Sequence, residues 1–193
     1  LTSWLSICIA GFGTLPFVWA QTTWHIWGIA LLGALFQAGY SLLLAYGYDH
    51  YDLGVLYPIA RGVAPLLSAI WASLWLGDQI HLGGVIAIIL ITGGTIWIGV
   101  RQQQAHGGRW RIPWMPLLIA GMISGYTIID AFGTRQSTPL TYYSACMTCT
   151  ALCMLPVVYW HQHGDLSQWR HEIPKAAIIG SMSFISYLIV LSC

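Results

Sequence analysis

Two charged side chains lie inside long apolar stretches of the sequence, where an unpaired charge is costly. Arg61 falls within the apolar run 55–77, and Asp130 falls within the apolar run 115–133. A charge at the centre of a membrane helix costs at least about 2.5 kcal/mol, so such residues face the protein interior or a wet cavity. The planar guanidinium group of Arg61 matches a carboxylate or phosphate, and a carboxylate such as Asp130 can carry a proton or pair with an arginine. We therefore expect Arg61 and Asp130 to face one substrate cavity.

Polar and aromatic residues accompany these two charges at helical spacing. Steps of three or four residues along the run 55–77 place Tyr57, Ser68 and Trp71 on the same stripe as Arg61. Neighbouring runs contribute further polar and aromatic candidates for the cavity wall. The complete set of expected substrate-binding residues is Arg61, Tyr57, Ser68, Trp71, Gln37, Tyr40, Tyr126, Asp130 and Tyr187.

Both charges also have a structural interpretation, which the sequence leaves open. The Arg61 side chain could extend toward the membrane surface or pair with a structural carboxylate. Asp130 lies five residues before Arg135, so the two could form an ion pair at the level of the lipid headgroups.

The composition of the chain explains why its apolar runs are interpreted as membrane spans. Of its 193 residues, 57% are hydrophobic and only 7% are charged, whereas a soluble domain carries about 25% charged residues. So few charges cannot cover a water-soluble globule, and a net charge of +1 does not favour nucleic-acid binding. The composition therefore predicts a multi-pass membrane protein with the lipid bilayer as its partner.

Seven runs are apolar and long enough to approach the roughly 20 residues of a spanning helix. Helices are expected because lipid cannot satisfy exposed backbone polar groups, and the runs lack the strict alternation of a β-barrel strand. The sequence thus predicts an all-α membrane protein. The predicted spans are 1–20, 28–48, 55–77, 82–100, 115–133, 139–160 and 176–193.

A weak internal repeat relates the early spans to the late ones. Residues 15–19 read LPFVW and residues 155–159 read LPVVY, while LLG at 31–33 lines up with IIG at 178–180. The repeating unit would then contain five spans, and an odd number of spans inverts the second unit relative to the first. We therefore expect the chain to be a fragment of a ten-helix fold, with one further span before residue 1 and two after residue 193.

One stretch of the sequence resembles a known family. Residues 57–100 contain a helix with two prolines that ends in Leu76-Gly77-Asp78, then a short polar link and a glycine-rich helix. This pattern resembles the end of an EamA repeat of the drug/metabolite transporter superfamily, in which the acidic residue is more often Glu. The resemblance implies two inverted five-helix repeats and the transport of small metabolites.

The resemblance also implies domain boundaries and an orientation. Residues 1–100 would form the first EamA repeat without its first helix, 101–114 a connecting loop, and 115–193 the second repeat without its last two helices. The family's cytoplasmic termini would place the loop 101–114 outside. Counting basic residues places the same loop inside, so the orientation stays open.

The remaining motifs favour packing over chemistry. Cys146, Cys149 and Cys153 lie on one helix without an accompanying His or carboxylate, so we expect them to pack rather than to bind a metal. The G-x-x-x-G pattern of Gly121 and Gly125 favours close helix packing, with homodimer formation as the weaker option. Nucleotide-binding and hydrolase motifs are missing from the sequence, and we expect neither a cofactor nor an enzymatic activity.

The function that these features favour is secondary transport. We expect a multi-pass protein of the cell (inner) membrane that moves a small metabolite, amino-acid-like or another small organic molecule including anionic ones, by alternating access. A seven-helix receptor or sensor is one alternative, although the only lysine, Lys175, lies between spans and cannot form a buried Schiff base. A membrane-embedded enzyme is the other, although it would need more titratable groups at one depth.

Overall fold

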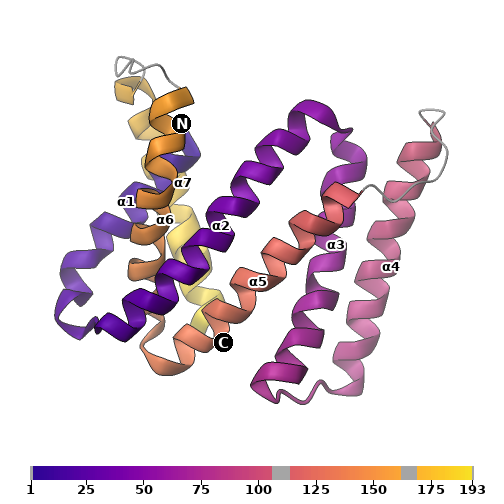
Figure 1. Cartoon of the computed structure of the whole chain (residues 1–193), viewed down its shortest axis with the longest axis horizontal. Coiled ribbons are helices and arrows are strands. Elements are labelled where there is room, and N and C mark those ends of the chain that lie inside the picture. The colour runs from indigo at the N-terminus through magenta and orange to yellow at the C-terminus, as the bar shows by residue number, and fades with distance from the viewer. Residues whose placement is uncertain (1, 106–113, 162–168, 193) are drawn as a thin grey trace. The chain divides into compact units, whose positions relative to one another are not determined.

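The chain folds into helices throughout the part that the structure describes (Figure 1). This computed structural model describes residues 2–105, 114–161 and 169–192. Those ranges contain seven α-helices and no strand, which confirms the all-α class. The helices are α1 (Thr2–Val18), α2 (Trp24–His50), α3 (Leu53–Trp71), α4 (Leu82–Ala105), α5 (Trp114–Gln136), α6 (Pro139–His161) and α7 (Trp169–Ser192).

Five of these helical stretches have the length and hydropathy of a membrane span. Within the described residues, α1 and α7 supply shorter apolar stretches, Trp4–Val18 and Ile173–Met182. The expectation of seven helices is therefore confirmed, and within the described residues five of them supply a candidate span. The chain is a multi-pass membrane protein. The five candidate spans are Trp24–His50, Gly54–Leu76, Leu82–Gln102, Trp114–Gln136 and Pro139–Trp160.

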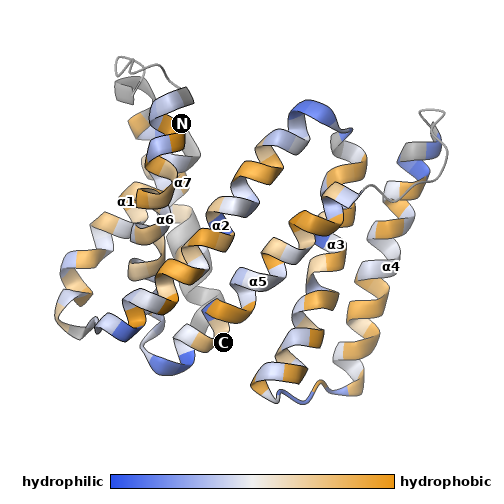
Figure 2. Cartoon of the chain, viewed as in Figure 1, coloured by the Kyte–Doolittle hydropathy of each residue, from blue (hydrophilic) through white to orange (hydrophobic). Residues whose placement is uncertain are grey.

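The spans differ in how much of their surface the protein itself covers. Of the 18-residue apolar stretch that identifies each span, 61% is buried in α6, against 11% in α4. Hydrophobic residues, orange in Figure 2, nevertheless recur along α4. The side chains of Leu82, Ile89 and Leu90 are exposed there. A large exposed apolar surface is unfavourable in water and favourable in lipid, so the outer surface of α4 fits a bilayer.

The chain divides into two compact units, which are described separately. The first comprises residues 1–38 and 129–193, and the second comprises residues 39–128. Helices α2 and α5 each contribute to both units. These units are defined by packing within the structure. The predicted boundaries around the loop 101–114 are defined by a repeat in the sequence, so the units do not test them and they stay a prediction.

Helix α6, in the first unit, is the most buried of the candidate spans. Every residue from 141 to 151 is buried, although several of them are polar. The hydroxyl groups of Thr148 and Thr150 donate to carbonyl oxygens one turn earlier in α6, at 2.7 and 2.8 Å. Because these donors are satisfied within the helix, polar residues can occupy the core at little cost.

Helix α1 packs closely against α6 in the same unit. The indole nitrogen of Trp4 donates to the carbonyl oxygen of Ala151 at 2.9 Å, and the Ser144 hydroxyl donates to the Thr14 hydroxyl at 2.7 Å. Gly11 permits this approach, because a Cβ atom there would lie 2.7 Å from the backbone nitrogen of Thr148. Small residues commonly allow helix backbones to meet in this way in membranes.

In the second unit, α3 and α4 form a helical hairpin. The Asp52 side chain caps α3 by accepting a hydrogen bond from the Gly54 amide at 2.8 Å. Helix α3 remains continuous through Pro58 and Pro65 and passes into a π-helical segment, η2 (Ala72–Leu76). Gly77 ends this segment with a φ of 68°, a left-handed conformation that glycine adopts without steric cost. The glycine of the Leu-Gly-acid pattern therefore has a structural role.

The close contact between α1 and α6 gives a testable prediction. Gly11→Ala should lower the free energy of unfolding by about 1–3 kcal/mol, because its methyl group would meet the α6 backbone, which cannot rotate away. Gly13→Ala is the matched control on the same helix, since nothing lies within 4 Å of its Cβ position. That variant should be neutral or more stable by about 0.5–1 kcal/mol. Denaturant unfolding in detergent measures both, and equal stabilities would contradict this packing.

Candidate functional site

Arg61 is held over an aromatic ring by the periodicity of α3. Tyr57 lies one helical turn before it, and the guanidinium carbon of Arg61 is 5.5 Å from the centre of the Tyr57 ring. Residues four positions apart on a helix are neighbours, so this cation–π pair follows directly from the sequence spacing.

Three further tyrosines of the second unit surround the guanidinium group. The Tyr40 side chain of α2 is hydrogen-bonded to Arg61, and Tyr126 of α5 is close enough to interact with it electrostatically. The rings of Tyr40 and Tyr126 pack against each other with centroids 6.1 Å apart. Tyr48 of α2 also interacts electrostatically with Arg61. We call Tyr40, Tyr48, Tyr57 and Tyr126 the tyrosine cluster.

The tyrosine cluster leaves the cation accessible. Arg61 is exposed, Tyr57 retains 44% of its surface, and Tyr40 and Tyr126 are half-buried. A guanidinium group with free N–H donors can bind a carboxylate or phosphate through two parallel hydrogen bonds. The adjacent phenol groups add hydroxyl donors and flat apolar surfaces. This arrangement can bind an anionic group that is attached to an apolar or aromatic body.

Two other predicted residues of α3 lie farther from the cation. Ser68 is half-buried, and Trp71 packs against Trp75 with ring centroids 5.0 Å apart. At 1.5 Å per residue, Trp71 is about 15 Å along the helix from Arg61. The predicted stripe therefore exists on one helix, and only its first part contacts the guanidinium group.

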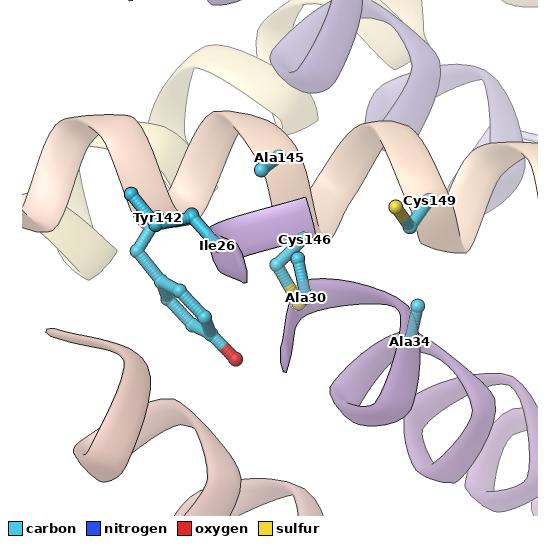
Figure 3. Close-up of a cluster of buried hydrophobic side chains, with 7 residues drawn as sticks. All are labelled: Ile26, Ala30, Ala34, Tyr142, Ala145, Cys146 and Cys149. Carbon is cyan, nitrogen blue, oxygen red and sulfur yellow. The ribbon is translucent and has the colours of Figure 1, made fainter. Parts of the chain in front are cut away.

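Asp130 forms a second polar centre, which belongs to the first unit. Its side chain is only 8% exposed, and the Tyr142 hydroxyl donates to its Oδ1 atom at 2.8 Å. The Sγ atom of Cys146 lies 3.9 Å from the same oxygen. Figure 3 shows Tyr142 reaching away from α6 with its hydroxyl group at the far end. The carboxylate of α5 is thus tied to α6 by a short hydrogen bond.

Gln37 of α2 joins this centre through α6. Its Oε1 atom lies 3.0 Å from Oγ1 of Thr150, where it shares the hydroxyl proton with the Cys146 carbonyl oxygen, and 3.9 Å from Sγ of Cys146. The thiol therefore lies between the Gln37 amide and the Asp130 carboxylate. Tyr142, Cys146 and Thr150 follow one another at intervals of four residues, so they share one face of α6.

Two glycines create the space that Tyr142 occupies. A Cβ atom on Gly133 of α5 would collide with the Tyr142 ring. A Cβ atom on Gly33 of α2 would lie 3.1 Å from the Tyr142 hydroxyl and 3.2 Å from Oδ1 of Asp130. Because the Tyr142 side chain is completely buried in this slot, its hydroxyl group is held in one position.

The structure thus groups the predicted residues into two separate sets of contacts. Arg61 interacts with residues of the second unit, and Asp130 with residues of the first. A cavity shared by Arg61 and Asp130 stays a prediction. Tyr187 lies on α7, and its side chain is outside the described part of the chain.

Sequence reasoning missed several residues of these two sets. Tyr48 follows Tyr40 by two helical turns, a spacing that could have revealed its place in the tyrosine cluster. Thr150 carries a comparable signal, because it is a polar residue that lies eight positions after Tyr142 on the same face of an apolar span. The predicted packing role of the cysteines is confirmed, because Cys146 and Cys149 are core residues and Cys153 packs against them.

The hydrogen bond between α5 and α6 gives a second prediction. Tyr142→Phe should lower the free energy of unfolding by about 1–3 kcal/mol, because it removes a short hydrogen bond to a buried carboxylate and changes little in volume. Tyr159→Phe removes a hydroxyl group from the exposed part of the same helix and should change stability by less than about 0.5 kcal/mol. Thermal unfolding in detergent compares the two, and similar values would argue against this hydrogen bond.

Comparison with family models, with curated proteins and with solved structures finds no match to this chain. The family suggested by residues 57–100 therefore has no support beyond the sequence pattern itself. What is established is a multi-helix membrane protein with five candidate spans.

Proposed function

We propose that this protein is a secondary transporter of the EamA type, which moves a small metabolite across the membrane by alternating access. The observation that carries the proposal is the exposed Arg61 guanidinium group, held on a candidate membrane span among tyrosine side chains. A cation in such a position is costly unless water or an anion reaches it. A substrate that carries an anionic group would offset this cost each time it binds.

The residues around Arg61 suggest the class of substrate. The guanidinium group would bind a carboxylate, and the Tyr40 hydroxyl would donate a further hydrogen bond. The exposed face of Tyr57 and the ring of Tyr126 would contact the apolar part of the molecule. Amino acids and other small organic acids with an aromatic or aliphatic body combine these features.

The predicted inverted repeat supplies a mechanism for transport. In transporters built from two inverted halves, the substrate lies between the halves, which rock around it. In this proposal the complete protein has ten helices, and the exposed apolar surface of α4 faces the lipid of the cell membrane. Binding of an anion to Arg61 would neutralise the charge before the halves move, because an uncompensated charge opposes transfer through a dry intermediate.

Uptake by the full-length protein in proteoliposomes tests this proposal. Phenylacetate and phenylalanine serve as carboxylate probes, and phenethylamine serves as a probe without a carboxylate. Hydrogen bonds to charged groups contribute about 1.5–3 kcal/mol, so Arg61→Gln should reduce saturable carboxylate uptake by roughly 10-fold to 150-fold. Arg61→Lys should restore part of the uptake, because it keeps the charge and loses the two-pronged geometry.

The matched control is Arg101→Gln. Arg101 is also exposed and also lies over an aromatic ring, 4.9 Å from the Trp97 centroid, at the end of α4. Its substitution should leave uptake unchanged. If Arg61→Gln transports as well as the parent protein, Arg61 is not part of the substrate site, and if no probe shows saturable uptake, the proposed class of substrate is wrong.

A further inference from the structure

A buried carboxylate within a candidate span is the strongest feature that the proposed function leaves unused. Asp130 lies on α5 within the span Trp114–Gln136 and is 8% exposed. The side chains that contact its Oδ1 atom come from α6, with the Tyr142 hydroxyl at 2.8 Å and Sγ of Cys146 at 3.9 Å. A permanently charged carboxylate is expensive in such a place, whereas a carboxyl group that takes up a proton becomes neutral.

The groups around Asp130 are suited to both forms of the carboxyl group. Described groups close to it include Tyr142 and Cys146 of α6 and the uncharged Gly33 of α2, and Gln37 of α2 lies on the other side of the Cys146 thiol. On α5 itself the nearest charged residue along the chain is Arg135, which is exposed. The ionised form accepts the Tyr142 hydrogen bond with its full charge, and the protonated form can accept the same bond through its carbonyl oxygen.

The strength of the hydrogen bond between Tyr142 and Asp130 depends on the charge of the carboxyl group. The slot between Gly33 and Gly133 fixes the Tyr142 ring. The tyrosine hydroxyl therefore cannot form a hydrogen bond with another group unless α6 moves. A hydrogen bond to an ionised carboxylate is about twice as strong as one between neutral groups. Loss of the charge therefore weakens the hydrogen bond that ties α6 to α5.

We propose that Asp130 is a proton-binding site and that its proton occupancy sets how firmly α6 is held against α5. A proton from water adds to one carboxylate oxygen, giving a neutral carboxylic acid, and the reverse step returns the proton to water. No other bond forms or breaks. The proposal goes beyond the proposed function, since neither Arg61 nor a transported substrate takes part in it. If the protein is a transporter, the proton is its coupling ion.

Infrared difference spectroscopy of the full-length protein in lipid nanodiscs tests this directly. Spectra recorded between alkaline and acidic buffers should show the carbonyl band of a carboxylic acid that appears as the pH falls. Other carboxyl groups absorb in the same region, so the Asp130 band is the component that the parent protein shows and Asp130→Asn should lack. Asp49→Asn, which removes an exposed carboxylate from α2, is the matched control and should keep it.

Tyr142→Phe tests whether Tyr142 is hydrogen-bonded to the titrating group, because the frequency of the Asp130 carbonyl band would not change if Tyr142 only filled space. The phenylalanine ring fills the same slot but cannot donate to the carboxyl group, so the Asp130 band should shift to higher frequency while remaining present. A band that keeps its frequency would show that Tyr142 does not bond the titrating group, and would overturn the proposed link to α6.

Two further results would overturn the proposal. The first is an acid spectrum that Asp130→Asn leaves unchanged, which would assign the whole titration to other carboxyl groups. The second is competition by sodium: if replacing potassium with sodium at constant pH shifts the midpoint of the Asp130 band, the oxygens of this centre bind a metal cation rather than only a proton. Neither result depends on uptake measurements with the Arg61 variants. The proposal of proton binding at Asp130 and the proposal of transport can therefore be refuted separately.

Discussion

A polar group inside a bilayer must find its hydrogen-bond partner within the protein, because hydrocarbon offers none. This constraint explains the organisation of α6, whose buried Thr148 and Thr150 hydroxyl groups donate to their own helix. It also explains the Trp4 indole, which donates to a carbonyl oxygen of α6. Asp130 obeys the same rule through Tyr142. Arg61 is different, because it is exposed and its neighbours are tyrosines rather than a sealed set of acceptors.

Glycines make these contacts possible by letting side chains and backbones approach closely. Gly11 allows α1 to meet the α6 backbone, and Gly133 provides the space for the Tyr142 ring. Small residues therefore permit the close packing, and the close packing in turn fixes the Tyr142 hydroxyl as a hydrogen-bond donor to Asp130. Arg61 depends on a simpler device, the one-turn spacing to Tyr57 along a continuous α3.

Features that depend on a single helix could be predicted from the sequence, whereas side-chain contacts between two helices could not. The runs 82–100 and 139–160 begin at the same residues as α4 and α6, because apolar length alone defines a span. The pairing of Arg61 with Tyr57 likewise follows from spacing on one helix. The partnership of Asp130 with Tyr142 could not be predicted, because it depends on how α5 packs against α6 and on the space left by a glycine.

We propose that Arg61 faces water and an anionic ligand rather than lipid. Modification by a water-soluble arylglyoxal, which reacts with arginine, tests it on the full-length protein in proteoliposomes, with each arginine peptide quantified by mass spectrometry. Arg101 at the end of α4 provides the internal reference for a reactive arginine. The account predicts that Arg61 reacts and that phenylacetate protects it while Arg101 stays reactive. An Arg61 that remains unmodified while Arg101 reacts, or that phenylacetate fails to protect, would contradict the account.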